Sequence, residues 1–262
     1  MIPAVSLATP SEISGIGGFV GSDDWVVEQK VDGHRIRMWT GSSPRFETRN
    51  GTEYTKSIPA SIRNANIPEG WVLDGELAGG VLWVFDILST QVPMSGLPLR
   101  DRRVILDQVL DAFGNESIKA LPQATTTEDK KALVFRVANE GLEGVVAKAA
   151  DSTYHPGRNR FWYKVKYTAT ADVIVMSVGD DGKESATLGI KTANGVVEVG
   201  RCSLIGKPRV GVGDVVEVKY LYLTEDGRLY QPTLMRVRFD KNPDDCDGSD
   251  FRVVSKRVLE SL

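Results

Sequence analysis

The sequence predicts a two-domain protein in which an α+β domain precedes a small all-β domain. In the first part of the chain, apolar runs rich in β-branched residues alternate with segments whose apolar residues recur at helical spacing. After residue 168 the helical spacing disappears, and short strands alternate with glycine turns. Several short strands within fewer than about 100 residues are typical of a barrel of the OB type. We therefore predict domains at 1–168 and 169–262.

The helices of the first domain are predicted from spacing and end signals. Leu99–Phe113 has apolar residues three and four positions apart, and Gly114 follows as a stop signal. The segment 127–140 begins with acidic residues after Thr126 or Thr127 as N-cap, and a short helix is expected at 57–64. Strands are expected at 25–29, 35–39, 46–48, 71–73, 82–88, 144–148 and 161–167.

One segment near the N-terminus has no clear helix or strand pattern. Gly15–Gly21 is rich in glycine and is expected to be a flexible connector, because its glycines miss the spacing of a dinucleotide-binding loop.

The second domain is predicted to consist mainly of short strands. Strands are expected within 171–178, 186–192, 196–200, 213–223 and 232–239. Phe251–Leu259 is expected to form a closing helix or strand.

Composition restricts the class of protein. Hydrophobic residues make up 41% and charged residues 26% of the 262 residues, as in ordinary globular proteins. Cys202 is expected to be a small core residue and Cys246, in an acidic segment, to be exposed. Two cysteines without metal-ligand neighbours are too few for a zinc site of four ligands. There is no run of membrane-spanning length and no signal-like N-terminus, so we expect a cytoplasmic protein of a bacterial or phage-infected cell.

The distribution of charge along the sequence is compatible with a nucleic-acid partner. A net charge of −3 argues against binding of nucleic acid by the whole surface, but a local basic face is compatible with it. Between residues 148 and 170, five basic residues stand against one acid, Asp151. This local excess predicts a surface that contacts phosphates.

Seven clusters of charged and aromatic residues occur in order along the chain. Each alone is a common pattern, such as an acidic turn or a basic strand edge. Transfer of a nucleotidyl group requires a nucleophile, cations for the phosphates, a carboxylate-held metal and a surface for the base, and together the clusters supply all four. They are EQKVDGHR at 28–35, TRNG at 48–51, LDGEL at 73–77, VFD at 84–86, EGVVAK at 143–148, WYKVK at 162–166 and RVRFDK at 236–241.

This ordered set resembles the covalent nucleotidyltransferase superfamily, and most closely the ATP-dependent DNA ligases, over roughly residues 25–241. The resemblance implies a minimal ligase with a nucleotidyltransferase (adenylation) domain of antiparallel sheets and flanking helices, followed by an OB-fold domain. It also implies sealing of 3′-OH/5′-phosphate nicks in duplex DNA through a lysyl-AMP intermediate and then a DNA-adenylate. ATP as AMP donor, Mg²⁺ or Mn²⁺, and nicked duplex DNA are the implied cofactors and partner, and a monomer is expected.

The resemblance also implies a role for each matched residue. Lys30 is the expected nucleophile, and Asp32 is expected to act near the 5′-phosphate. The catalytic residues close to phosphate are Arg49, Lys148, Lys164 and Lys166. Nucleotide-binding roles fall on Glu28 at the adenine amino group, Phe85 on its ring, Arg35 and Glu76 at the ribose, and Arg236, Arg238, Asp240 and Lys241 at the pyrophosphate. Metal ligation falls on Glu143 and Glu76, and DNA contacts fall on Arg49, Arg158 and Arg160.

Three other functions share parts of this pattern. An RNA ligase and an mRNA capping guanylyltransferase use the same lysine chemistry, although Glu28, the YHPGR segment and the WYKVK segment favour DNA ligases. A non-catalytic OB-fold nucleic-acid-binding protein is the third alternative. All the chemical positions are filled here, which favours an enzyme.

Overall fold

The computed structural model describes residues 3–179, 184–224, 226–249 and 251. Contacts divide the chain into two compact units. Of the described residues, the first unit comprises 3–134 and 144–165, and the second comprises 135–143 and those from 166 to 251. The change of unit after 165 lies close to the domain boundary predicted at 168.

The first unit contains two five-stranded sheets. One sheet has the strand order β1-β10-β9-β2-β8. Its strands are β1 (Ser6–Ser11), β10 (Gly157–Lys166), β9 (Gly144–Ala149), β2 (Trp25–Gln29) and β8 (Gln123–Ala124). β2 runs antiparallel to β9 and β8, whereas β1 runs parallel to β10. The N-terminal strand β1 and the short β8 were not predicted from the sequence.

The second sheet of this unit has the order β4-β3-β5-β6-β7. Its strands are β4 (Arg45–Glu47), β3 (His34–Trp39), β5 (Trp71–Ala78), β6 (Val81–Thr90) and β7 (Ile118–Ala120). β4, β3, β5 and β6 pair antiparallel, and β7 joins β6 in parallel. The predicted α+β class with antiparallel sheets is confirmed, with two parallel edge pairs added.

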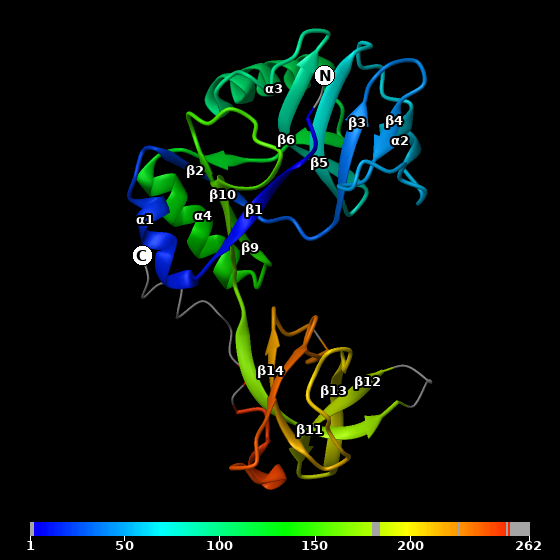
Figure 1. The fold of residues 1–262 in the computed structure, drawn as a ribbon, viewed down its shortest axis with the longest axis vertical. Helices are drawn as coiled ribbons and strands as arrows, with labels where there is room; N and C mark the ends of the chain where they lie inside the picture. Colours follow the sequence, from blue (N-terminus) through cyan, green and yellow to red (C-terminus); the bar gives the residue numbers. More distant parts are fainter. Residues whose placement is uncertain (1–2, 180–183, 225, 250, 252–262) are drawn as a thin grey trace. The chain divides into compact units, whose positions relative to one another are not determined.

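Helices cover these sheets where the sequence predicted them. α3 (Leu99–Phe113) has the predicted bounds, and it packs Leu106 and Leu110 into the core of the second sheet. Figure 1 shows α3 alongside β6. α4 (Thr127–Asn139) begins after Thr126, whose hydroxyl accepts from the Asp129 amide at 3.1 Å. α2 (Ala60–Arg63) is shorter than predicted.

The glycine-rich segment at the N-terminus is not a flexible connector, so this prediction was wrong. It forms a 3₁₀ turn (Ile13–Gly15) and α1 (Ile16–Val20). Ile16 and Val20 are buried, and α1 contacts β2. The burial of two apolar side chains one helical turn apart outweighs the poor helix propensity of the glycines.

The second unit is built on one five-stranded sheet with the order β13-β12-β11-β14-β15. Its strands are β11 (Ala169–Val178), β12 (Ser185–Thr192), β13 (Gly195–Ser203), β14 (Val215–Tyr220) and β15 (Thr233–Val237), followed by a 3₁₀ turn (Pro243–Asp245). β13 and β15 stand at opposite ends of this order and yet contact each other, so the sheet curls toward a closed barrel. The barrel predicted from the strand-and-turn pattern is confirmed.

Two further predictions concern the end of the chain. Cys246 was expected to be exposed, but it is buried against Ile174 and Val215, because the 3₁₀ turn that precedes it directs the chain back onto the barrel. The closing element predicted at Phe251–Leu259 lies outside the described residues beyond position 251. Within the described ranges, none of the helices has both the length and the apolar character needed to cross a membrane.

Candidate active site

The first unit contains a cavity of about 480 Å³. Its wall is formed by residues from β1, β2, β3, β5, β6, β9 and β10 and from the loops between them. The site residues predicted from sequence that line it are Glu28, Lys30, Arg35, Arg49, Glu76, Phe85, Lys148, Arg158 and Lys164. Residues more than 100 positions apart in the chain therefore surround one volume.

Lys30 lies immediately after β2, at the wall of this cavity. Its backbone amide donates to the carbonyl of Gly144 at 2.8 Å, which fixes the end of β2 against the beginning of β9. Gly33 follows at a close approach to β5, where an added Cβ would collide with the carbonyl of Leu77. The glycine in the Lys30–Gly33 stretch is therefore required by packing against the neighbouring strand.

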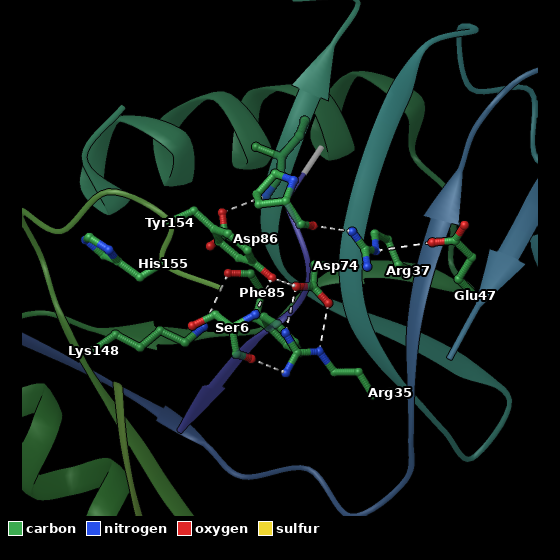
Figure 2. A network of polar contacts seen from close by, with 12 residues as sticks. Ser6, Arg35, Arg37, Glu47, Asp74, Phe85, Asp86, Lys148, Tyr154 and His155 are labelled. Carbon is green, nitrogen blue, oxygen red and sulfur yellow. Dashed lines mark hydrogen bonds and ion pairs between the residues drawn. The ribbon is translucent and has the colours of Figure 1, made fainter. Parts of the chain in front are cut away.

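Arg35 belongs to a buried polar network that Figure 2 shows from close by. Its guanidinium makes a two-pronged contact with the carboxylate of Asp74, at 2.8 and 2.7 Å, and donates to the carbonyl of Ser6 at 3.1 Å. The hydroxyl of Tyr154 donates to Asp74 at 2.7 Å and accepts from the Ser6 amide at 2.8 Å. One network therefore joins β1, β3, β5 and the loop before β10.

Titration behaviour follows from this network. Burial alone would raise the pKa of Asp74, but the charge and hydrogen bonds of Arg35, together with Tyr154, lower it below its ordinary value. Burial and the negative charge of Asp74 raise the pKa of Tyr154 well above its ordinary value. Asp74 is therefore charged and Tyr154 is neutral, as their hydrogen bonds require.

A second buried pair stands beside the aromatic wall of the cavity. The Lys148 ammonium lies 2.6 Å from Glu28 Oε2, and the two side chains are 2% and 1% exposed. The same ammonium lies 4.4 Å from the ring centre of Phe85 and 4.2 Å from that of Trp162. Burial lowers the pKa of Lys148, and the charge of Glu28 opposes this effect.

The other oxygen of Glu28 is also held. The amide nitrogen of Gln123 donates to Oε1 at 2.8 Å, and the guanidinium of Arg103 lies 4.0 Å from it. Gln123 stands directly opposite Glu28 in the β2–β8 pairing. The carboxylate of Glu28 is therefore fixed in one orientation before any ligand is bound.

The residue that follows Phe85 in β6, Asp86, forms a fully buried ion pair. Arg102 on α3 contacts the carboxylate of Asp86 at 2.7 and 2.8 Å, and both side chains are 0% exposed. Arg102 also donates to the backbone carbonyls of Leu97 and Ser152. Since Asp86 follows Phe85 in β6, this pair fixes the strand that carries the aromatic residue.

Sequence reasoning missed several contributors to the site. Asp74, Asp86 and Trp162 were noticed within the clusters but received no role, and Tyr154 and Gln123 were not singled out as partners. Their importance arises from contacts across strands that are distant in sequence, such as that between Tyr154 and Asp74. A possible signal was the presence of these polar residues in runs that otherwise indicate buried strands.

Other predicted site residues lie elsewhere. Asp32 and Arg160 are not among the residues that line the cavity. Glu143 and Lys166 belong to the second unit, where their side chains pair at 2.6 Å. Among the described residues there is no group of three or more His, Cys, Asp or Glu side chains placed to hold a metal ion.

The last cluster begins at the end of β15 in the second unit and continues past it. Arg238 contacts Asp172 at 3.0 Å and Asp240 at 2.9 Å, and Lys241 contacts Asp172 at 2.8 Å. Arg236 pairs with Glu217 at 2.6 Å. The hydrogen bonds from Arg238 lower the pKa of Asp240 to about 2. The predicted pyrophosphate-binding residues are therefore held by carboxylates of their own unit.

Comparisons with known proteins agree with this fold. Residues 79–166 match the family model described as ATP dependent DNA ligase domain. A multifunctional non-homologous end joining protein LigD of Mycolicibacterium smegmatis is 29% identical over 84% of this chain and 37% of its own length. A DNA ligase of Methanoculleus marisnigri is 34% identical over 76% of this chain and 42% of its own length. This chain therefore spans less than half the length of these relatives.

Solved structures share this fold. A Lig E DNA ligase superposes with a TM-score of 0.64 and 21% identity, over 91% of this chain and 100% of its own. A mycobacterial DNA ligase D complexed with ATP superposes with a TM-score of 0.56 and 24% identity, over 93% and 97% of the two chains. The fold is thus that of a nucleotidyltransferase domain followed by an OB domain.

Proposed function

Because the chain belongs to the ATP-dependent DNA ligase family, we propose that it seals nicks in duplex DNA as a monomer, with ATP as the donor of AMP. One observation carries this proposal. Nine site residues predicted from the sequence, Lys30 among them, come from separate segments of the chain and line a single cavity. That volume falls within the range of small-molecule sites in proteins.

In the first step, the amine of Lys30 attacks the α-phosphorus of ATP. A nitrogen–phosphorus bond forms, the bond to the β-phosphate oxygen breaks, and pyrophosphate leaves. Arg49 and Lys164, which line the same cavity, are cations that offset charge developing on the phosphate oxygens. Phe85 offers an aromatic face for the base.

In the later steps, the 5′-phosphate of the nick takes AMP from Lys30, and the 3′-hydroxyl then displaces AMP to form the phosphodiester. Arg158 lines the cavity, and Arg160 follows two residues later in β10 with its guanidinium 5.5 Å from the ring of Phe161. We assign both to phosphate contacts with the DNA. Binding of DNA should accordingly weaken steeply as salt is added.

Magnesium fits the donor set only in part. Mg²⁺ in nucleotide sites commonly takes one or two carboxylates together with substrate phosphates and water. Glu76 lines the cavity and suits this mode, whereas Glu143 is paired with Lys166. The ion would supply neutralisation of phosphate charge.

The proposal is tested by incubating the protein with α-labelled ATP and Mg²⁺ in the absence of DNA. The wild type should acquire label, and Lys30→Ala should lose it completely, because no other residue is proposed as nucleophile. Lys119→Ala removes an exposed lysine on β7 and should label like the wild type. With a nicked duplex added, the wild type should join the strands, while Lys30→Ala, Glu143→Ala and Lys166→Ala should not.

Retention of label by Lys30→Ala would contradict the assignment of the nucleophile. Preferential labelling by GTP would indicate a capping enzyme instead. Labelling without joining of a nicked duplex, but with joining of RNA, would point to an RNA ligase.

A further inference from the structure

Strand β10 departs from regular pairing where it passes the cavity. Ala8 of β1 pairs with Asn159, but the next residue of β1, Thr9, pairs with Tyr163. β10 therefore carries three extra residues, 160–162, at this point, and we call this segment the β10 bulge. Irregularities of this kind bend a strand and redirect its side chains, and they are frequent beside active sites.

The β10 bulge accounts for which side chains of the strand line the cavity. Alternate residues of a regular strand share one face, so Arg158, Arg160 and Trp162 would all lie on the same side. Arg158 and Trp162 line the cavity, whereas Arg160 is not among its lining residues. The bulge interrupts the alternation and thereby separates Arg160 from the two side chains that flank it.

The side chain of Asn159 holds the β10 bulge through its oxygen. Oδ1 accepts from the backbone amide of Phe161 at 2.9 Å and from that of Trp162 at 3.2 Å. Two of the three residues in the bulge thus have hydrogen-bonded amides although β1 offers them no pairing position. These bonds fix the backbone that places Trp162 in the cavity wall.

The amide nitrogen of the same side chain holds the segment before the bulge. Nδ2 lies 2.9 Å from the hydroxyl of Ser6 and 3.1 Å from each of the backbone carbonyl oxygens of His155 and Gly157. Backbone carbonyls only accept and backbone amides only donate, so the two ends of the Asn159 side chain cannot be exchanged. Arg158 lies between Gly157 and Asn159, and its backbone is therefore fixed on both sides.

We propose that Asn159 is a positioning residue, which acts on the reaction by holding Arg158 toward a phosphate of the DNA and Trp162 beside the nucleotide. The sequence assigns DNA contacts to the arginines on either side and gives Asn159 no role. Both polar atoms of its side chain are engaged within the protein, so its effect passes through its neighbours. This inference rests on the proposed function, in which Arg158 contacts phosphate.

The test measures how the binding of a fluorescently labelled nicked duplex depends on salt, by anisotropy in the absence of ATP and Mg²⁺. Each phosphate contact that is lost reduces the slope of log Kd against log salt concentration by about one. Arg158→Ala should show this reduction and bind about 10-fold more weakly. Asn159→Ala removes no charge and should nevertheless show the same reduction, because Arg158 is no longer held toward the phosphate. Asn139→Ala, at an exposed position of α4, should bind like the wild type.

A double variant shows whether Asn159 acts through Arg158. In Arg158→Ala/Asn159→Ala, the salt slope and the affinity should equal those of Arg158→Ala alone, because the contact is already absent. An unchanged salt slope in folded Asn159→Ala would overturn the inference. A further loss of affinity in the double variant, as large as that caused by Asn159→Ala alone, would also overturn it.

A milder variant separates the two ends of the side chain and keeps the test decisive if Asn159→Ala does not fold. Asn159→Ser retains an oxygen that can accept from the amide two residues later, as serine does in turns, but it lacks the donor toward His155 and Gly157. Its salt slope should fall as in Asn159→Ala. The ATP concentration for half-maximal self-adenylation should stay near the wild-type value, whereas Asn159→Ala should raise it. A wild-type salt slope in Asn159→Ser would overturn the inference.

Labelling of the wild type with α-labelled ATP and Mg²⁺, carried out in parallel, separates this inference from the proposed function. Reduced salt slopes in the Asn159 variants without any lysyl-AMP adduct in the wild type would refute the ligase chemistry and leave the positioning role in place. An adduct together with unchanged slopes would do the reverse. Absence of nicked-duplex binding by the wild type would refute both.

Discussion

The charged residues of the cavity and those at the end of the second unit are organised in opposite ways. Glu28 and Lys148 in the cavity wall, and Asp74 behind Arg35, are at most 2% exposed, and each has its partner within hydrogen-bond distance. In the second unit, Arg236 is 63% and Asp240 is 69% exposed. Buried pairs are costly to break, whereas exposed pairs in water are worth little.

This difference in exposure suggests that the two groups of charged residues have different functions. A cavity whose polar groups are fixed in advance binds a nucleotide with little reorganisation. Exposed side chains can exchange one carboxylate partner for a phosphate at small cost. Arg238 and Lys241 share Asp172 and are partly exposed, at 19% and 23%, and we propose that they make such an exchange during the release of pyrophosphate.

The largest expected effect on stability concerns the support of Phe85. Arg102→Met should lower the free energy of unfolding by about 3–5 kcal/mol, because it leaves the carboxylate of Asp86 buried without its cation. Denaturant unfolding of the purified protein measures this. Arg102→Met/Asp86→Asn should recover part of the loss, and a loss in the double variant as large as or larger than that in the single variant would contradict the argument.

A smaller effect is expected in the network around Arg35. Asp74→Asn should cost about 1–3 kcal/mol at pH 7, because the bonds to Arg35 and Tyr154 lose their charge assistance. Asp74 has a lower pKa folded than unfolded, so it contributes stability above about pH 4 and loses it as pH falls through the folded value.

As the pH is lowered into the acidic range, the free energy of unfolding should therefore fall less steeply for Asp74→Asn than for the wild type. Urea unfolding at a series of pH values between about 2 and 7 measures it. Asp111→Asn alters an exposed carboxylate on α3 and should keep the wild-type curve. Identical pH dependence of Asp74→Asn and wild type would exclude Asp74 as the responsible group.

The partly exposed residues Arg238 and Lys241 should act on one step of the reaction more than on the others. Arg238→Ala or Lys241→Ala should slow self-adenylation by about 10- to 100-fold, as for the loss of one group that stabilises charge in the transition state. Sealing of a pre-adenylated nick should change much less, because pyrophosphate is absent from that step. Lys219→Ala, at an exposed position of β14, serves as a control and should leave both steps unchanged. Equal losses in the two assays would contradict a role at the leaving group.

The smallest effect is expected at the pair of Arg236 with Glu217, in which the arginine is 63% exposed. Arg236→Ala should change the free energy of unfolding by less than about 1 kcal/mol, although its contact with Glu217 measures 2.6 Å. Added salt should reduce even this difference. Thermal or denaturant unfolding at two salt concentrations would reveal it, and a cost comparable to that of Arg102→Met would remove the contrast between the two regions.

The local elements of this protein were determined by the sequence. α3 has the predicted bounds because its apolar spacing and Gly114, which adopts φ +55° after the last turn, are properties of neighbouring residues. The clusters around Lys30, Glu76 and Lys148 were likewise visible as patterns. Their residue types state which chemistry is available.

The tertiary structure alone decided which of these residues meet. The bond from Tyr154 to Asp74, the pairing of Lys148 with Glu28 and the parallel addition of β1 to β10 join segments that are far apart in the chain. Burial of Cys246 and the folding of α1 were decided in the same way. Sequence periodicity records which face of an element is apolar, whereas long-range partners depend on how the elements pack together.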